Sequence, residues 1–551
     1  MTGEAITDGA AARGAEEPAS AGEAQTTNRI VGSARWWALG AVLLTMFFSS
    51  LDQTVVSTAM PTIVADLRGV AIYAWVFTAY MLTSAVTVPI YGRLSDIYGR
   101  KPFYVFGLAV FMVGSAVSGQ AHTMLELVLF RGLQGIGAGA MLSMPRATIG
   151  DIFNPRERGN WMGIITGVFG LATIVGPFLG GWITDHWGWR WVFYINLPVA
   201  AAALAAISVA LPRVRTAQRA RVDWTGSLLL VVGIVPMLLG FTWAGSRFAW
   251  GSAPVVALLA ASVAVLALFT WAEGRAAEPV LPTRFFRNGI FLATNVISLL
   301  MTMGMFGVML FLPVYVQGVI GMSAQNSGAI MTPMMLSFMI GALVSGPVMT
   351  RTGRYKALAV AGGLLMSAGL FLLSRLGPGA YWGAVVRDML VMGVGIGLLM
   401  PIMSLAVQNA FPYHEMGTVT ATQQFVTSLG GVIASPILGT ILTAAFTSRL
   451  KVLLPAASSL PPAAANPQNL INAQAQAAIQ SQFTRLPGGD ALYRAFVSAV
   501  RVALAHGMQR LFLIALFFGL AALVATFFLP QARLKRDDFF AEERPAEKIA
   551  D

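Results

Sequence analysis

One acidic residue stands inside a long apolar stretch, and its position indicates proton chemistry. Asp52 lies within residues 40–60, which otherwise read as a membrane-spanning helix. A charge at the centre of a bilayer costs about 2.5 to 3.5 kcal/mol on insertion scales, so we expect this carboxyl group to face a water-filled cavity or a partner. Held in that way, it could bind and release a proton. The alternative is a carboxylate near the outer end of its helix, wetted by solvent, that only helps to set the topology.

A cation that cannot lose its proton, Arg131, lies about two turns into the fourth apolar stretch. Beside a carboxylate, it would make proton release depend on conformation or on bound substrate. The alternative is an arginine that bonds to backbone carbonyls and holds two helices together. Arg387 and Asp388 are a candidate counterpart pair in the second half, but adjacent residues on a helix point about 100° apart, which favours a structural use.

The segment between the second and third apolar stretches reads GRLSDIYGRK and is a candidate gate. Its residues of interest are Gly92, Arg93, Asp96, Gly99, Arg100 and Lys101. The glycines permit a tight turn with positive φ. The Asp96 carboxylate can pair with cations or with the N-terminus of a neighbouring helix, which would form a breakable latch on the cytoplasmic side. The alternative is ordinary basic loop charge that only sets topology.

The fifth apolar stretch is rich in glycine and contains one proline. These residues are Gly163, Gly167, Gly170, Gly176, Pro177, Gly180 and Gly181. Small residues at this spacing let helix backbones approach closely, and proline weakens the helix locally. Such a helix is suited to bending or sliding, although close packing without a gating role remains the alternative.

Uncharged polar side chains in apolar stretches are candidates for a substrate cavity. They are Gln53, Gln134, Asn295, Gln317, Gln423 and Gln424, to which we add Arg387 and Asp388. Each one alone is more often a helix–helix hydrogen bond than a ligand contact. Cysteine is absent and the four histidines are scattered, so we expect no metal site, no cofactor and no enzymatic nucleophile.

The elements that must position these residues are transmembrane helices. Of the 551 residues, 56% are hydrophobic and only 11% are charged, and the mean hydropathy is +0.70. Soluble domains carry about 25% charged residues, so the bilayer must be the solvent for most of the chain. The net charge of +12 lies in short loops, where membrane topology explains it better than nucleic-acid binding does.

Apolar runs of about 20 residues predict fourteen spans. We place them at 36–58, 72–91, 103–120, 126–145, 161–182, 191–211, 224–243, 254–271, 290–316, 325–349, 357–373, 382–408, 418–446 and 508–529. Alternate loops hold about sixteen Lys and Arg residues and the opposite short loops hold about four. By the positive-inside rule, both termini are expected in the cytoplasm.

An internal repeat divides these spans into two related halves. Arg131 precedes Pro145 by fourteen residues, and Arg387 precedes Pro401 by fourteen residues, with glycines between them in both cases. We therefore predict a disordered cytoplasmic tail (1–35), an N-terminal six-helix bundle (36–211), a two-helix insert with flanking loops (212–288), a C-terminal six-helix bundle (289–529) with an extracytoplasmic loop (447–507), and a cytoplasmic tail (530–551). Transporters with paired repeats bind substrate near the midplane, between the halves.

Several motifs together resemble those of the fourteen-span drug:proton antiporters of the major facilitator superfamily, over about residues 36–529. They are LDQTVVSTAMPTI (51–63), GRLSDIYGRK (92–101), FRGLQGIGAGA (130–140), GPFLGGWITDHWGWRWVFYINLP (176–198) and FLPVYVQGVIGMSAQNSGAIMTP (311–333). The resemblance implies an all-α membrane protein with the major facilitator fold. It also implies exchange of substrate for protons, with Asp52 and Arg131 in coupling roles, Asp96 and Arg100 in the cytoplasmic gate, and Gly176 with Pro177 in the antiporter helix.

The sequence departs from the family pattern at three places. Ser57 stands where the first motif commonly has asparagine, and Arg351 replaces the acid in the second-half loop that would correspond to Asp96. The acid that the family carries in late helices, associated with divalent cation substrates, has no clear match in residues 418–446. The charge of the substrate therefore stays open.

Proton-driven efflux of small hydrophobic compounds by a monomer in the cytoplasmic membrane is the leading hypothesis. The alternatives within transport are proton-coupled uptake and the movement of lipids or siderophores. A membrane enzyme or sensor is the remaining alternative, and the sequence shows no ATP-binding loop or catalytic constellation that favours it.

Overall fold

The structure is a computed structural model that describes residues 33–67, 72, 74–153, 155–211, 223–245, 247–276, 279–322, 331–352, 354–412, 415–453, 481 and 489–531. The predicted tails (1–35 and 530–551) lie almost wholly outside these residues. So do residues 212–222 of the predicted insert and most of the predicted loop 447–507.

Helices account for nearly all of the described chain. The first half contains α1 (Ser33–Leu67), α2 (Ala74–Tyr98), α3 (Arg100–Gly119), α4 (Met124–Ile152), α5 (Pro155–Trp187), α6 (Trp191–Tyr194) and α7 (Asn196–Ala210). Then follow α8 (Trp224–Trp243), α9 (Ala253–Glu273) and the short η2 (Thr283–Arg287). The second half contains α10 (Gly289–Tyr315), η3 (Val316–Ile320), α12 (Thr332–Thr352), α13 (Lys356–Ser374), α14 (Trp382–Ala410), α15 (Met416–Leu453) and α17 (Gly489–Phe527).

Thirteen helical segments of the described residues are long and apolar enough to cross a membrane. In that count α6 and α7 form one span, and α10 with η3 forms another. A fourteenth helix, α2, is not in that count. It has 25 residues, about 37 Å of helix, which is long enough to cross a membrane. Its Thr, Ser and Tyr side chains lower its hydropathy, and much of the helix packs against protein. The prediction of an all-α protein with fourteen spans is confirmed, and helices are the expected solution because lipid cannot satisfy exposed backbone groups.

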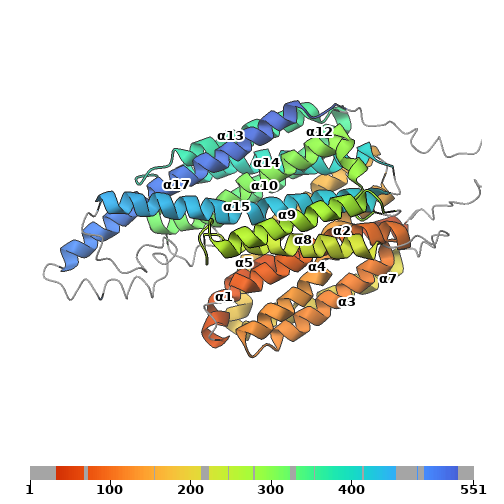
Figure 1. Cartoon of the computed structure of the whole chain (residues 1–551), viewed down its shortest axis with the longest axis horizontal. Coiled ribbons are helices and arrows are strands. Elements are labelled where there is room, and N and C mark those ends of the chain that lie inside the picture. The colour runs from red at the N-terminus through yellow and green to blue at the C-terminus, as the bar shows by residue number, and fades with distance from the viewer. Residues whose placement is uncertain are drawn as a thin grey trace, which may run out of the picture.

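Two bundles, each with its own hydrophobic core, make up the molecule (Figure 1). In the first, side chains such as Val56, Phe111 and Met141 are buried among α1, α3 and α4. In the second, a larger core includes Met366 and Leu511. The inserted helices α8 and α9 pack on each other, and Leu230 of α8 shares a cluster with residues of α2 and α15. The insert therefore covers the seam between the bundles.

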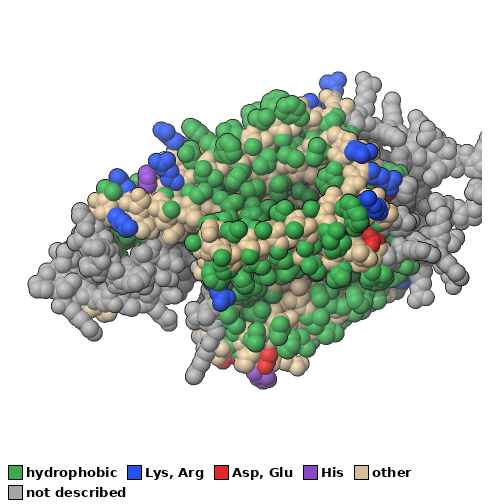
Figure 2. Space-filling model, viewed as in Figure 1, with side chains coloured by type: hydrophobic (Ala, Val, Ile, Leu, Met, Phe, Trp, Pro, Cys, Tyr) green, Lys and Arg blue, Asp and Glu red, His purple; other side chains and the backbone are tan. Residues whose placement is uncertain are grey.

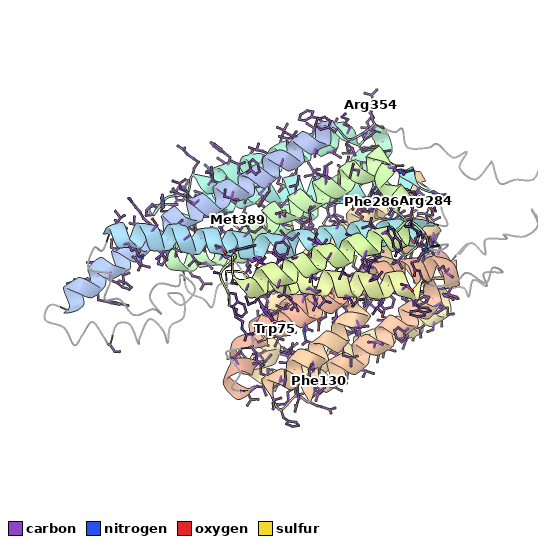
Figure 3. All side chains as sticks on the ribbon, viewed as in Figure 1. Trp75, Phe130, Arg284, Phe286, Arg354 and Met389 are labelled. Atoms are coloured by element: carbon purple, nitrogen blue, oxygen red, sulfur yellow. The ribbon has the colours of Figure 1, made fainter. Side chains whose placement is uncertain are left out.

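Apolar side chains cover the middle of the outer surface. Phe106, Phe178, Val209 and Phe517 are all more than half exposed, and Figure 2 shows hydrophobic side chains over the waist with Lys and Arg toward the ends. Figure 3 places Arg284 and Arg354 toward one end of the molecule and Trp75, at the start of α2, well away from that end. An exposed apolar band of this extent requires lipid around it.

The predicted loop 447–507 is partly helical. Helix α15 continues to Leu453, and α17 begins at Gly489, whereas we predicted its start at Met508. Phe496 and Val500 of α17 are buried in the same hydrophobic cluster as Phe446 and Leu450 of α15. Because only one face of these extensions is apolar, their mean hydropathy is low, and a criterion based on continuous apolar runs missed them.

Two other boundaries were wrong, and a third lies outside the described residues. The segment 92–101 is not a loop: α2 runs to Tyr98 and α3 begins at Arg100, with Gly99 alone making the turn at φ 87°. Arg146 lies inside α4, not in the loop that follows the fourth span. Helix α12 begins at Thr332, and residues 325–330 of the predicted tenth span lie outside the described residues.

Asp66, near the end of α1, forms hydrogen bonds with the turn before α6, and these bonds favour its ionised form. The Oδ2 atom of Asp66 accepts hydrogen bonds from Trp189 Nε1 at 2.9 Å and from Arg190 Nη1 at 3.1 Å. These two hydrogen bonds hold the pKa of Asp66 below its usual value of 3.8, and the bond from Trp189 has the larger effect.

The contribution of this contact is therefore present at higher pH and is lost as the pH falls through the lowered pKa. We expect the 19F resonance of 5-fluorotryptophan at position 189, assigned with Trp189→Phe, to titrate with a midpoint below 3.8. The Asp66→Asn variant should show no such transition. A midpoint above the usual value would contradict the prediction.

Candidate functional site

The carboxylate of Asp52 is buried inside the N-terminal bundle and accepts three hydrogen bonds. Arg131 Nη1 of α4 donates to Oδ2 at 2.7 Å. Gln134 Nε2, one turn further along α4, and Asn196 Nδ2 of α7 donate to Oδ1 at 3.0 and 2.8 Å. Arg131 also donates to Gln134 Oε1 at 2.8 Å. Asp52 and Arg131 are 1% and 0% exposed, so these two candidate residues form an ion pair that is shielded from solvent.

Close helix packing positions this cluster. The guanidinium of Arg131 stacks on the Tyr80 ring of α2, with its Cζ atom 4.1 Å from the ring centroid, a cation–π contact. At Gly135 of α4, an added Cβ would collide with Thr83 Oγ1 and lie 2.9 Å from the Cα of Tyr80. Only glycine allows α2 to approach α4 so closely, and that approach brings the Tyr80 ring over the arginine.

Two members of the cluster, Asn196 and Ser115, were missed by our sequence analysis. Asn196 Nδ2 donates to Ser115 Oγ of α3 at 3.1 Å, and Ser115 Oγ donates to the Phe193 carbonyl at 2.8 Å. Asn196 is a single amide after an aromatic stretch, 144 residues from Asp52. Its only signal is its polarity at the start of an apolar run. Through Asn196 the Asp52 carboxylate links α1 with α7 and α3, and through Arg131 and Gln134 it links α1 with α4.

This arrangement can respond to a proton. A carboxylate is acceptor-only, whereas a protonated carboxyl group becomes a donor. Adding a proton to Asp52 would remove the charge opposite Arg131, and because its three partners are all donors, it would weaken the bonds that the carboxylate accepts. The four helices that meet at this acid would then lose part of what holds them together. Because the carboxylate faces the interior of one bundle and not an open cavity, access for the proton requires a conformational change.

A second acid, Asp96, joins the two bundles at one end of the molecule. Its carboxylate accepts from the backbone nitrogens of Gly417 and Thr418, at 2.8 and 2.6 Å, and from Thr418 Oγ1 at 2.7 Å. These nitrogens lie in the first turn of α15, where N–H groups lack partners within the helix and the dipole favours an anion. Arg100 pairs with Asp96 at 2.6 Å and with Asp151 of α4 at 2.8 Å.

The other predicted gate residues lie around this contact. Gly92 packs so tightly on Gly417 and Ala421 that an added Cβ would collide with both. Lys101 Nζ bonds to the Ser208 carbonyl near the end of α7. Arg93 is half-buried on α2. Arg284 also pairs with Glu415, directly before α15, so the start of this helix is held at two places.

Replacing Asp96 with asparagine should loosen this end. The amide nitrogen cannot accept from the α15 backbone, and the charge opposite Arg100 is lost. Hydrogen bonds to charged groups are worth about 1.5 to 3 kcal/mol, so we expect the ratio of open to closed forms to rise about tenfold or more. The chain has no cysteine, so labelling of a single Met403→Cys reporter by a thiol reagent measures opening.

The control is Asp185→Asn, which makes the same change in an exposed acid near the far end of α5. In the Asp185→Asn protein, the Met403→Cys reporter should react with the thiol reagent at the same rate as it does without the Asp185 substitution. Equal labelling rates in the Asp96→Asn and Asp185→Asn proteins would contradict a latch.

The glycine-rich helix α5 lies between α1 of its own bundle and α12 of the other. A Cβ at Gly163 would lie 2.5 Å from the Ala342 carbonyl oxygen of α12. Further along, a Cβ at Gly176 or Gly180 would collide with Thr54 or Thr58 of α1. Pro177 lies within this second contact, and a Cβ at Gly181 would meet nothing within 4 Å. The helix thus has one close face for each neighbour.

The predicted cavity residues do not converge on one site. Gln134 belongs to the Asp52 cluster. Asn295 Nδ2 donates to the Phe291 carbonyl of its own helix at 2.8 Å. Arg387 Nη2 pairs with the neighbouring Asp388 at 2.8 Å, despite the angle between adjacent residues. The half-buried residues are Gln53, Gln317 and Gln424.

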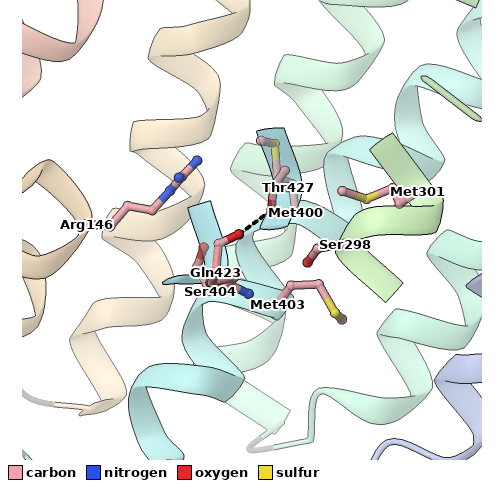
Figure 4. A pocket seen from close by; sticks show the side chains of 8 residues that line it. All are labelled: Arg146, Ser298, Met301, Met400, Met403, Ser404, Gln423 and Thr427. Carbon is pink, nitrogen blue, oxygen red and sulfur yellow. Dashed lines mark hydrogen bonds between the residues drawn. The ribbon is translucent and has the colours of Figure 1, made fainter. Parts of the chain in front are cut away.

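Gln423 alone of this set lines a cavity found at the seam between the bundles (Figure 4). Its walls come from α4, α10, α14 and α15, and its free volume is about 10 Å³, room for about one water molecule. The lining residues are Arg146, Ser298, Met301, Met400, Met403, Ser404, Gln423 and Thr427. Among the described residues, no cluster of three or more His, Cys, Asp or Glu side chains could hold a metal ion.

In the described part of the chain, fourteen membrane-length helices form two six-helix bundles and a two-helix insert. Together with the buried ion pair in one bundle and the acid-to-helix contact between the bundles, they define a polytopic membrane transporter. A sequence model of the major facilitator superfamily matches residues 42–435. The chain belongs to the major facilitator superfamily.

Two similar proteins come from Bacillus subtilis (strain 168). The multidrug transporter protein MdtP is 37% identical over 530 residues, covering 94% of this chain and 97% of that protein. Multidrug resistance protein 3 is 34% identical over 515 residues, covering 93% and 98%. The solved structure of the proton:xylose symporter XylE matches with a TM-score of 0.57 at 14% identity, covering 91% of this chain and 97% of that one, which shows the shared fold. The prediction of a transporter and not an enzyme is thereby confirmed.

Proposed function

We propose that this chain is a proton-coupled antiporter that exports small hydrophobic or amphipathic compounds, drugs and antibiotics among them, across the cytoplasmic membrane. Relatives that cover nearly the whole chain are named for multidrug transport and multidrug resistance. The observation that carries the proton coupling is the buried pair of Asp52 and Arg131, joined at 2.7 Å. An intramembrane ion pair of this kind is costly and is typical of proton relays.

In the proposed cycle, the described conformation is the one closed toward the cytoplasm. The distribution of Lys and Arg supports a cytoplasmic position for the Asp96 end and for both termini. With this end sealed, a conformational change gives Asp52 access to the outside, where it takes up a proton and releases Arg131. The weakened bundle then rocks against its partner, the contact of Asp96 with α15 breaks, and the cavity at the seam opens to the cytoplasm. Proton release and substrate binding restore the ion pair.

The driving force is adequate for this exchange. One proton that crosses a potential of about 100 mV contributes roughly 2.3 kcal/mol before any pH difference. A single protonatable site in the N-terminal bundle would couple that energy to each cycle. The cavity between the bundles would carry the substrate.

Everted membrane vesicles test the direction and the coupling. We expect vesicles that contain the chain to accumulate at least one of ethidium, rhodamine 123 and fluorescein when the interior is acid, and to release it when nigericin collapses the gradient. Vesicles without the chain are the control. Accumulation only with an alkaline interior would instead show proton-coupled uptake. Absence of dye flux under every gradient would contradict drug export and favour lipid or siderophore transport, or a sensor.

A further inference from the structure

An arginine without a protein partner lies in the cavity at the seam. Arg146 of α4 is 8% exposed, and among the described residues it makes no side-chain hydrogen bond or ion pair. Figure 4 shows its side chain extending from α4 toward α15. Its backbone carbonyl accepts from Gln408 Nε2 of α14 at 3.0 Å, which fixes α4 to the other bundle at this point. A buried cation is normally paired, and one that is not marks a functional site.

Other polar groups around this cavity also lack protein partners. Gln423 Nε2 is buried with no hydrogen-bond acceptor in the described part of the chain. The hydroxyls of Ser298 and Ser404 make no hydrogen bond there either, although the two residues are 2% and 6% exposed. Unsatisfied buried groups are costly and uncommon in native structures. Together with Arg146, these residues supply three donors from the C-terminal bundle and a cation from the N-terminal bundle.

The chemistry of these groups selects the ligand. A guanidinium is always charged, and its planar fork matches a carboxylate with two parallel bonds. The amide nitrogen of Gln423 donates only, and hydroxyls can donate. Among the described residues, no acid lines the cavity, so a cationic ligand would meet an uncompensated positive charge. Met301 and Met403, both buried, add flexible and polarisable surface that adapts to varied apolar shapes.

We propose that Arg146 anchors an anion-binding subsite and that the compounds this chain carries include small apolar molecules with a carboxylate. The inference rests on the proposed export function and narrows its substrate class. In the described conformation the space holds about one water molecule. Because its walls belong to both bundles, rocking of the halves widens it enough to admit a ligand.

Binding to the purified full-length protein tests the subsite directly. Fluorescein and rhodamine 123 share a xanthene ring system but carry opposite charge, and fluorescence anisotropy measures the affinity of each. We expect fluorescein to bind at least about tenfold more tightly than rhodamine 123. Arg146→Gln should weaken fluorescein binding at least about tenfold, the value of a charged hydrogen bond. Arg275→Gln, which removes an arginine that stacks on Trp271 at the end of α9, should change neither affinity.

A second variant keeps the test decisive if Arg146→Gln does not fold. Ser404→Asp places a carboxylate in the cavity, where it would pair with Arg146 and occupy the subsite. We expect this protein to fold and to lose fluorescein binding. Unchanged fluorescein affinity in either variant would overturn the proposal and leave a trapped water as the partner of Arg146.

Vesicle transport of the same dyes separates this inference from the proposed function. If rhodamine 123 moves with the proton gradient while fluorescein neither binds nor moves, export stands and the anion subsite fails. If fluorescein binds through Arg146 but no dye moves under any gradient, the subsite stands and export fails.

Discussion

Replacing Asp52 with asparagine should abolish transport driven by the pH gradient. The amide has nearly the shape of the carboxylate, but it cannot carry the proton. Export into acid-inside vesicles should fall to the background of empty vesicles, whereas downhill movement of a preloaded dye should persist. The measurement is the initial rate of dye uptake as a function of the pH difference. Transport that stays fully responsive to the gradient would place the proton carrier elsewhere.

The same substitution leaves Arg131 buried without a counter-ion, so its effect on folding must be separated from its effect on coupling. Breaking a buried ion pair costs about 3 to 5 kcal/mol. We expect the double variant Asp52→Asn/Arg131→Gln to recover part of that stability in thermal unfolding, because no charge is then left alone, and still to be uncoupled. Asp66→Asn makes the same change on the same helix outside the cluster. It should leave coupling intact.

A larger side chain at Gly163 should stop the transport cycle with little effect on the fold of each bundle. In the described conformation, its Cβ would lie 2.5 Å from the Ala342 carbonyl oxygen of α12. Gly163→Leu should therefore hold α5 and α12 apart and favour the form open at the Asp96 end. We expect transport to fall at least about tenfold, since overpacking of this kind costs about 1 to 3 kcal/mol. Labelling of the Met403→Cys reporter should rise.

Gly181→Leu is the matched control, because it lies on the same helix and meets nothing within 4 Å. Its transport rate should match the unmodified chain. Equal losses in both variants would show that α5 is sensitive to any added bulk, and the contact with α12 would then have no special role.

Both members of the ion pair, although not their contact, could be singled out from the sequence because lipid makes intramembrane charges conspicuous. Asp52 and Arg131 each interrupt an apolar run, and each has few acceptable partners. Gln134 was expected in a cavity but bonds to Asp52, because a glutamine one turn from Arg131 shares its helix face. Asn196 could not be placed, since its partner lies in another helix and a single amide in an apolar run has many uses.

The contact of Asp96 with the start of α15 could be predicted only in part. The sequence indicated that Asp96 could meet a helix N-terminus, but the donors proved to be backbone nitrogens of Gly417 and Thr418, which no side-chain pattern reveals. Arg146 was misplaced for a related reason. A positive-inside count treats every arginine near a helix end as loop charge. Only the fold shows that α4 continues past it and turns its side chain toward the seam.

Helices α15 and α17, with 38 and 39 residues, are each about 57 Å long, well beyond the hydrocarbon thickness of about 30 Å. The ends of the two helices beyond the membrane pack together and belong to the C-terminal bundle. A small tilt of that bundle in the membrane would therefore displace Lys451, near the end of α15, by several ångströms. Since the chain contains no cysteine, spin labels placed there and at His122 of the other bundle would report the motion as a distance, with no background thiols to remove.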